Sequence, residues 1–387
     1  MKIGVNGRFL VKPHTGIGRY TRDLFLEAAR NHPELQFVFV VPDVPPAPYR
    51  WGFENVEITV LPEIGRGPAG FKKTFWEQVQ VPRYFKSINA DLVHFPYPCN
   101  PWFKSPFPTV VTVHDTIPWT LPEYRKSFLT RLYQDRCKNA VRKADKVLCV
   151  SESAKKEVAE VCKTDAEKIT VIYNAVTESF TQKIPEDAKK AVLRKYGLSP
   201  DRPFFLYVGG YDARKNVKKL VEVFVSEIAP EFAVDFVLAG GKCLESKLYE
   251  SYDELTKLIN DTSVKSDKGK MAVTGFMDES DLPALYQSAL AFLNLSKKEG
   301  FNLPLLEACA SGLPAIVSDL PVHHEVAGDT AVYCHPDDGK CLQIHMKELL
   351  KDSAYYQKQK LKAESFVNNF SWKSSAEKLI WVYKSLS

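Results

Sequence analysis

Short apolar segments rich in β-branched residues alternate with amphipathic stretches along nearly the whole chain, and this alternation constrains the fold most strongly. In the first half the strand-like segments are KIGVN, FVFVV, VEITV, ADLVHF, TVVTVHD, KVLCVS and KITVIYN. In the second half they are FFLYVGG, DFVLAGG, MAVTGF, LAFLNLS, PAIVSD and TAVYCHP. Near-continuous apolar strands separated by helical patterns are typical of parallel sheets covered on both faces. The sequence therefore predicts an α/β protein.

The alternation pauses once, at residues 177–187, where a polar stretch ends in Pro-Glu-Asp and indicates a linker followed by a helix start. A chain of 387 residues is long enough for two or three domains. We therefore expect two Rossmann-like, doubly wound domains, at residues 1–180 and 186–370. Open parallel sheets bind ligands at the carboxyl ends of their strands, so two such sheets predict a site in a cleft between the domains.

Composition and charge exclude several classes of protein. Hydrophobic residues make up 45% of the chain and charged residues 26%, so the chain can bury apolar cores. The formal net charge of +5 is a weak excess, without the dense basic stripe that nucleic-acid binding needs. The first residues, MKIGVNGRF, indicate a strand and not a signal peptide. Because the apolar runs are also far shorter than the ~18 residues of a membrane-spanning helix, we expect a cytoplasmic protein.

Several common catalytic motifs are absent from the sequence. It contains no G-x-x-x-x-G-K-[ST] phosphate loop and no H-E-x-x-H zinc motif. It also lacks the D-x-D that metal-dependent transferases use, so we expect no metal. The eight cysteines form no C-x-x-C pair, and we expect reduced thiols packed in the interior.

Gly16-Ile17-Gly18 begins like a dinucleotide fingerprint, but Thr21 stands where that fingerprint needs its last glycine. The glycines instead predict a flexible turn just ahead of a helix. Backbone N–H groups of such a turn can meet an anion, although an ordinary strand–helix turn would show the same residues.

A second feature combines Gly209-Gly210 at the end of a predicted strand with Arg214-Lys215 ahead of a helix expected from about Asn216. Basic side chains at a strand's carboxyl end, beside a helix N-terminus, are well placed to hold a diphosphate. A solvated charged loop is the alternative interpretation.

The strongest feature runs from Glu299 to Glu307. Gly300 permits a tight turn, and a helix is expected from about Leu303 to Ser311. We expect Glu299 to face sugar hydroxyls and Glu307 to face a ribose diol. Because Glu307 lies within an otherwise apolar helical stretch, the pattern argues against a solvated position for it. The N–H groups of the turn would meet phosphate or sugar oxygens.

The segment EGFNLPLLEACASGLPAIVSDLPVHHEVAGDTAVYCHP resembles the signature of the retaining GT-B glycosyltransferases of family four. Other motifs agree with that family in order and spacing, namely GIGRYTRDL, VHDTIPW, VSESAKKEV, VIYNAV and VTGFMDESDLPALYQSA. The resemblance covers nearly the whole chain. It implies a GT-B fold, with two Rossmann-like domains facing across a cleft and a final helix at residues 371–387 crossing back to the first domain.

The resemblance also implies roles for single residues. His114, which ends a predicted strand and on its own would be a structural histidine, is expected to contact the donor sugar. Arg214 and Lys215 would neutralise the diphosphate as it leaves, so that with Glu299 these residues form the expected catalytic set. The other positions expected to bind the donor are Gly16, Gly18, Gly210, Gly275, Phe276, Gly300, Phe301, Asn302, Leu303 and Glu307. Asn302 stands where the family usually has glycine, and asparagine tolerates the positive φ of that turn.

The implied activity is metal-independent transfer of a hexose with retention of configuration. The preferred donor is GDP-mannose, with a UDP-sugar as the alternative, and the donor is a substrate, so no further cofactor is expected. The acceptor would be a glycan or a lipid-linked sugar in polysaccharide, lipopolysaccharide or glycolipid synthesis. An epimerase or phosphorylase of the same architecture, or a non-catalytic binding module, are the competing hypotheses.

The stretch from Arg66 to Lys86 mixes basic with aromatic residues. It predicts an acceptor-side wall, a surface that contacts the inner face of a membrane, or an ordinary amphipathic surface helix. No protein nucleophile is assigned.

Overall fold

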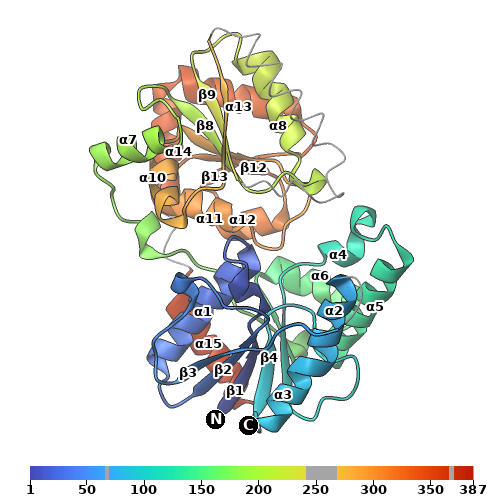
Figure 1. Cartoon of the computed structure of the whole chain (residues 1–387). Coiled ribbons are helices and arrows are strands. Elements are labelled where there is room, and N and C mark those ends of the chain that lie inside the picture. Colours follow the sequence, from blue (N-terminus) through green and yellow to red (C-terminus); the bar gives the residue numbers. More distant parts are fainter. Residues whose placement is uncertain (66–68, 241–267, 366–369, 387) are drawn as a thin grey trace. The chain divides into compact units, whose positions relative to one another are not determined.

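The computed structural model describes residues 1–65, 69–240, 268–365 and 370–386, and the chain divides into two compact units (Figure 1). The N-terminal unit comprises Met1–Asn174 and Phe370–Ser387, and the C-terminal unit comprises Ala175–Asn369. The boundary thus falls earlier than the predicted end of the first domain at residue 180. The reason is that Phe180 packs against Tyr286 of the C-terminal unit, with ring centroids 5.8 Å apart.

The N-terminal unit contains a seven-stranded parallel sheet in the order β3-β2-β1-β4-β5-β6-β7. Its strands are β1 (Lys2–Asn6), β2 (Gln36–Val41), β3 (Val56–Val60), β4 (Leu92–Phe95), β5 (Thr109–Val113), β6 (Lys146–Cys149) and β7 (Ile169–Val171). All seven coincide with apolar segments predicted as strands. The strand order reverses between β1 and β4, which places a topological switch point at their carboxyl ends.

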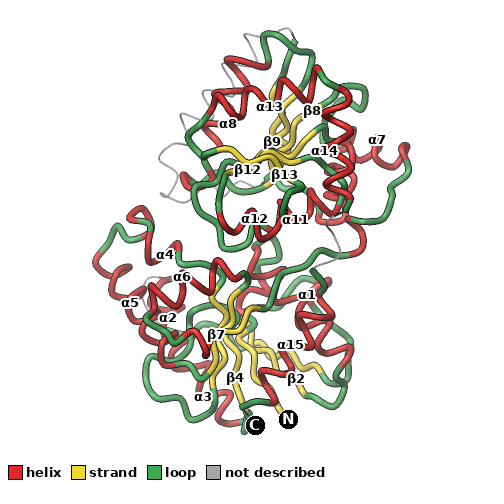
Figure 2. Tube along the Cα trace, turned by 180° about the vertical axis from the view of Figure 1, so that it is seen from behind, coloured by secondary structure: helices red, strands yellow, loops and turns green. Residues whose placement is uncertain are grey.

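Helices cover this sheet, and the C-terminal helix is one of them. They are α1 (Gly16–Asn31), α2 (Ala69–Phe75), α3 (Val81–Ser87), α4 (Ile117–Thr120), α5 (Phe128–Lys143), α6 (Glu152–Cys162) and α15 (Trp372–Lys384). A π-helical turn, Trp76–Gln80, joins α2 to α3, and a 3-10 turn, Arg8–Val11, follows β1. Helix α15 lies beside α1 in both views (Figures 1 and 2). The chain therefore ends in the unit in which it begins.

The C-terminal unit contains a six-stranded parallel sheet in the order β10-β9-β8-β11-β12-β13. Its strands are β8 (Phe204–Val208), β9 (Asp235–Ala239), β10 (Met271–Gly275), β11 (Ala291–Asn294), β12 (Ala315–Ser318) and β13 (Ala331–Cys334). Its helices are α7 (Glu186–Lys195), α8 (Val217–Val223), α10 (Leu282–Ser288), α11 (Leu303–Ala310), α12 (Pro321–Ala327), α13 (Gly339–Lys351) and α14 (Ser353–Glu364). The switch point of this sheet lies between β8 and β11.

Burial explains why the strands read as continuous apolar runs. Strands β4, β5, β11 and β12 are buried at every position, because helices cover both faces of each sheet. The two predicted doubly wound α/β sheets are therefore confirmed. None of the described helices combines the length and hydropathy that a membrane span requires.

The expectation that the cysteines are reduced thiols is wrong for one pair. Cys334 at the end of β13 and Cys341 in the first turn of α13 form a disulfide. The short turn between strand and helix folds back on itself, so the two side chains meet although the sequence shows no C-x-x-C spacing. Five other cysteines are free and buried, and Cys243 lies outside the described residues.

Candidate active site

The carboxylate of Glu299 contacts two cations from a distant part of the chain. Its Oε2 lies 2.9 Å from Nη1 of Arg214, and its Oε1 lies 2.5 Å from Nζ of Lys215. The two cations end the loop after β8, whereas Glu299 follows β11, the neighbouring strand across the switch point. The structure thus brings together three of the four residues predicted as catalytic, at the carboxyl edge of the C-terminal sheet.

These three side chains are largely buried, so their charges act strongly on one another. The side chains of Glu299, Lys215 and Arg214 are 6%, 11% and 18% exposed. Burial alone would raise the pKa of the Glu299 carboxyl, but the charges of Lys215 and Arg214 reverse this effect and hold the pKa well below its usual range. Glu299 is therefore ionised at neutral pH. Asp212, which the sequence did not single out, holds Nε of Arg214 at 3.2 Å.

Two asparagines in the left-handed conformation turn the chain into the helices at this edge. Asn216 precedes α8 with φ of 54°, and Asn302 precedes α11 with φ of 71°. The positive φ predicted for Asn302 is confirmed. Its Nδ2 donates to Nε2 of His323 at 2.9 Å, while Nδ1 of His323 donates to the carbonyl oxygen of Ser318 at 2.7 Å. His323 is thus a buried support of the turn that sequence reasoning missed.

Glu307 lies one turn inside α11 and has no solvent exposure. Its Oε2 accepts a hydrogen bond from the hydroxyl of Tyr286 at 2.8 Å. The interpretation that Glu307 is not on a solvated face is therefore confirmed. Its contact with a ribose stays a prediction. Tyr286 is a second partner that the sequence did not indicate, because it comes from α10.

The remaining positions predicted for the C-terminal unit lie at strand ends or at the start of α11. Gly210 follows β8, and its carbonyl oxygen accepts from the hydroxyl of Tyr207 at 2.5 Å. Gly275 ends β10 with φ of 70°, and the next side chain, Phe276, is 51% exposed. Gly300, Phe301 and Leu303 lead from Glu299 into α11.

Gly16 and Gly18 lie in the first turn of α1 and not in a turn ahead of it, so that part of the prediction is wrong. Oγ1 of Thr15 caps the helix by accepting from the N–H of Gly18 at 3.1 Å, so this N–H is already used within the helix. A Cβ at Gly18 would lie 2.5 Å from the carbonyl oxygen of Lys12, whereas one at Gly16 would meet nothing. Close packing therefore explains Gly18, and the anion-binding role of Gly16 stays a prediction.

His114 directly follows β5, at the carboxyl edge of the N-terminal sheet. Its Nε2 lies 2.9 Å from the carbonyl oxygen of Pro96. Because a carbonyl only accepts, the neutral ring carries its proton on Nε2 and a lone pair on Nδ1. Burial lowers the pKa of His114 to about 4, although the bond to Pro96 opposes this, so the ring is neutral at pH 7.

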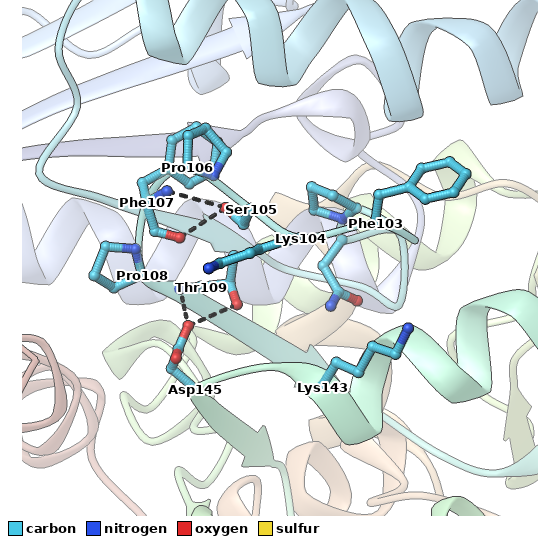
Figure 3. A pocket seen from close by; sticks show the side chains of 11 residues that line it. Phe103, Lys104, Ser105, Pro106, Phe107, Pro108, Thr109, Lys143 and Asp145 are labelled. Carbon is cyan, nitrogen blue, oxygen red and sulfur yellow. Dashed lines mark hydrogen bonds between the residues drawn. The ribbon is translucent and has the colours of Figure 1, made fainter.

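A pocket of about 450 Å³ in the N-terminal unit lies at the other edge of this sheet (Figure 3). Thr109, which begins β5, and Asp145, which precedes β6, belong to its lining, and Oδ2 of Asp145 accepts from the N–H of Thr109 at 2.7 Å. His114 lies at the opposite end of β5, roughly 16 Å away at about 3.3 Å per residue. This pocket is therefore separate from the candidate site.

The chain thus has two doubly wound parallel sheets, the architecture in which ligands bind at the carboxyl ends of strands, and one sheet has a cation–carboxylate cluster at its switch point. A sequence profile described as Glycosyltransferase Family 4 matches residues 14–180, and one described as Glycosyl transferases group 1 matches residues 188–366. The chain belongs to family 4 of the glycosyltransferases and has their GT-B fold. Among the classes predicted from the sequence, glycosyltransferase is the one that these matches support.

Individual relatives agree with this assignment. The O-antigen chain mannosyltransferase B of Escherichia coli is 26% identical over 278 residues, which are 72% of this chain and 70% of the relative. The O-antigen chain mannosyltransferase RfbU of Salmonella typhimurium is 30% identical over 241 residues, 62% of this chain and 60% of the relative. Among solved structures, Anabaena HepE in complex with UDP-glucose has a TM-score of 0.75 at 16% identity, with all of both chains covered, and so shares the fold.

Proposed function

We propose that this chain transfers mannose from GDP-mannose, with retention of configuration and without a metal, to a glycan or lipid-linked acceptor. The observation that carries the proposal is the contact of Glu299 with both Arg214 and Lys215 at the switch point between β8 and β11. The two relatives named as O-antigen chain mannosyltransferases support the choice of sugar and the link to surface polysaccharide. A nucleotide-sugar substrate needs no further cofactor.

The cation pair fits the chemistry of the leaving group. When the bond to the anomeric carbon breaks, a nucleoside diphosphate gains negative charge, and preorganised cations stabilise that charge most effectively where water is excluded. In this proposal Arg214 and Lys215 supply the positive charge that a metal supplies in other transferases. Glu299 keeps both cations in place and accepts hydrogen bonds from hydroxyls of the donor sugar.

Neither glutamate of the segment is proposed as a nucleophile. Glu299 is neutralised by two cations, which lowers the reactivity of its carboxylate, and Glu307 is fully buried against Tyr286. His114 is neutral and presents the lone pair of Nδ1, so it accepts a hydrogen bond from a sugar hydroxyl and does not act as an acid at pH 7.

The base of the nucleotide is proposed to lie at Gly275 and Phe276. Gly275 ends β10 and Phe276 directly follows it. Strand β10 is separated from β8 by β9 alone, so the two strands are roughly 10 Å apart at about 4.8 Å per strand. That separation suits the span from a diphosphate to its base. The half-exposed ring of Phe276 offers an apolar face on which a base can stack.

A transfer assay tests this proposal. Labelled GDP-mannose, UDP-glucose and ADP-glucose are each incubated with the enzyme and membranes or glycan extracts, with and without EDTA. We expect label to enter the acceptor from GDP-mannose, at a rate that EDTA leaves unchanged, and the new linkage to keep the anomeric configuration of the donor. Transfer from UDP-glucose alone would contradict GDP-mannose as the donor. Strict dependence on a divalent ion would contradict the metal-free mechanism.

We also propose that the N-terminal unit contacts an anionic lipid surface. A set of exposed apolar side chains, here called the α2–α5 patch, consists of Phe71, Phe75, Phe128, Leu129 and Leu132, which are 60%, 41%, 71%, 61% and 45% exposed. Helices α2 and α5 lie side by side in both views (Figures 1 and 2), and Nζ of Lys73 in α2 lies 5.2 Å from the ring centre of Tyr133 in α5.

The charges around the α2–α5 patch suit such a surface. Lys126 and Arg131 are exposed and Lys72 is half-buried, all within the same two helices or just ahead of α5. Apolar rings flanked by cations are typical of surfaces that bind anionic membranes. The first residues of the stretch predicted for this role, at positions 66–68, lie outside the described residues.

Vesicle co-sedimentation tests the contact. Wild-type protein should sediment with vesicles that contain anionic phosphatidylglycerol and much less with pure phosphatidylcholine. The double variant Phe128→Ser, Leu129→Ser should lose this binding, while the control Leu361→Ser, at an apolar residue 66% exposed in the C-terminal unit, should keep it. Equal sedimentation of the double variant would contradict the proposal.

A further inference from the structure

A chain of buried polar groups crosses the core of the N-terminal unit. Nδ1 of His94 lies 2.5 Å from the hydroxyl of Tyr383, and its Nε2 lies 2.8 Å from Oγ1 of Thr112. The hydroxyl of Tyr20 lies 3.3 Å from the same Oγ1. The four residues come from α15, β4, β5 and α1, and each is at most 1% exposed. Groups that are distant in sequence are thus joined by three consecutive hydrogen bonds.

His94 and Tyr383, two members of this series, are both uncharged. Burial, with a smaller effect from His114, lowers the pKa of His94 to about 3, so the ring is neutral. A neutral imidazole has one donor and one acceptor, and hydroxyls can supply both partners. Burial also raises the pKa of Tyr383 well above its usual range, so its hydroxyl keeps its proton. Buried networks whose members are all satisfied hold their groups in one arrangement.

The series of hydrogen bonds ends at Tyr20, which packs against His114, the histidine of the candidate site. The ring of Tyr20 meets the ring of His114 edge-on, with centroids 4.8 Å apart and an interplanar angle of 87°. Trp372, the first residue of α15, packs edge-on against Tyr20 with centroids 6.2 Å apart. The other side of His114 is held by its hydrogen bond to Pro96, which lies two residues after His94. One contact of His114 is therefore with Tyr20, at one end of this hydrogen-bonded series, and the other is with the segment that directly follows His94, within it.

We infer that Tyr20 and Tyr383 are positioning residues for His114, so that the C-terminal helix sets the orientation of the imidazole through His94 and Thr112. The inference rests on the proposed role of His114. It adds that helix α15, which is remote in sequence from every predicted site residue, controls the direction in which the lone pair on Nδ1 of His114 points. Helix α15 contributes to this with two side chains, the hydroxyl of Tyr383 and the ring of Trp372.

Three substitutions each remove one hydroxyl from this series of hydrogen bonds with little change in side-chain shape, namely Tyr383→Phe, Thr112→Val and Tyr20→Phe. We expect each to lower kcat by about 3- to 10-fold, the kinetic equivalent of one net hydrogen bond, with the KM for the donor within about two-fold. Thr112→Ser, which keeps the hydroxyl, should restore kcat. Tyr84→Phe is the matched control, because its hydroxyl also bonds a threonine, Thr59 at 3.0 Å, in the same unit. It should leave kcat unchanged.

Nitrogen-15 NMR of the imidazoles gives a readout that does not depend on activity. The resonances of His114, assigned with His114→Gln, should shift in Tyr383→Phe and Thr112→Val but not in Tyr84→Phe. Unchanged His114 resonances in both variants would overturn the inference, as would a wild-type kcat in folded Tyr383→Phe if His114→Gln lowers kcat. Shifted resonances with no effect of His114→Gln on turnover would instead contradict the proposed function of His114 while leaving the positioning intact.

Discussion

Glu299 and Lys215 are 84 residues apart in sequence, yet Oε1 of the first lies 2.5 Å from Nζ of the second. The contact joins the loop after β8 to the turn before α11, and Arg214 of the same loop holds the other carboxylate oxygen. Because Glu299 contacts both Arg214 and Lys215, the position of each of these three charges depends on the other two. If the donor binds at this cluster as proposed, its binding and the stability of the fold are coupled.

Replacing Glu299 by glutamine keeps its shape but removes the charge that holds both cations. We expect kcat to fall by at least about ten-fold, because the cations lose their orientation toward the leaving group. The free energy of unfolding should fall by about 3 kcal/mol, because a largely buried ion pair loses one partner. Steady-state kinetics and urea unfolding measure the two effects. A wild-type kcat in Glu299→Gln would contradict a role for Glu299 in the reaction.

The matched control for this variant is Lys297→Ala. Lys297 lies 3.3 Å from Asp337, but both side chains are more than half exposed, so the pair should contribute less than about 1 kcal/mol. From the sequence alone, substitution of Lys215 or Glu299 would be expected to leave the melting temperature nearly unchanged. The burial of the cluster changes that expectation for Glu299→Gln.

Stability should depend on pH through two histidines of the N-terminal unit. Burial lowers the pKa of His94 to about 3 and that of His114 to about 4, whereas both titrate near 6.5 in the unfolded chain. From about pH 6.5 down to pH 4 the unfolded state binds protons that the folded state does not, so stability falls as pH falls through this window. Urea unfolding at several pH values measures the slope. His114→Gln should make it shallower, and an unchanged slope would contradict a His114 that stays neutral in the folded protein.

The disulfide can be tested by counting thiols. The chain has eight cysteines, and with Cys334 joined to Cys341 the unfolded, unreduced protein should show six thiols. The pair encloses a turn in which the carbonyl oxygen of Pro336 accepts from Nδ2 of Asn216 at 2.7 Å, next to Lys215. Reduction should lower stability by about 2–3 kcal/mol, the loop-closure value for so short a ring.

A double variant, Cys334→Ser with Cys341→Ser, provides the control for that measurement. Its melting temperature should not respond to reductant, whereas that of the wild type should fall. Eight thiols in the unreduced wild type would show that the bond is absent in solution.

Local pattern was enough to predict the strands and the helices that carry the site. Every apolar segment taken as a strand is one, and the helix expected from Leu303 begins at that residue, because turn chemistry and apolar periodicity are short-range properties. The position of Arg214, Lys215 and Glu299 at one sheet edge also follows from the rule that ligands lie at strand carboxyl ends.

What the sequence could not show are contacts between elements that are distant along the chain. Three hydrogen bonds of this kind join different elements: Asn302 to His323, Tyr286 to Glu307, and His94 to Tyr383. No periodicity or spacing records these pairs. The start of α1 was misplaced for a related reason, since Gly18 reflects close packing against the carbonyl oxygen of Lys12 and not a loop.

The claim that the β8–β11 edge binds a nucleoside-diphosphate sugar is tested most directly by ligand-induced stabilisation. The melting temperatures of the wild type and of Lys215→Met are measured with GDP-mannose, UDP-glucose and ADP-glucose. A ligand that binds only the folded state stabilises it by about 2.7 kcal/mol at about 100 times its Kd. We predict that GDP-mannose raises the melting temperature of the wild type most and that Lys215→Met loses the greater part of this shift. An equal shift in the wild type and in Lys215→Met would contradict the account.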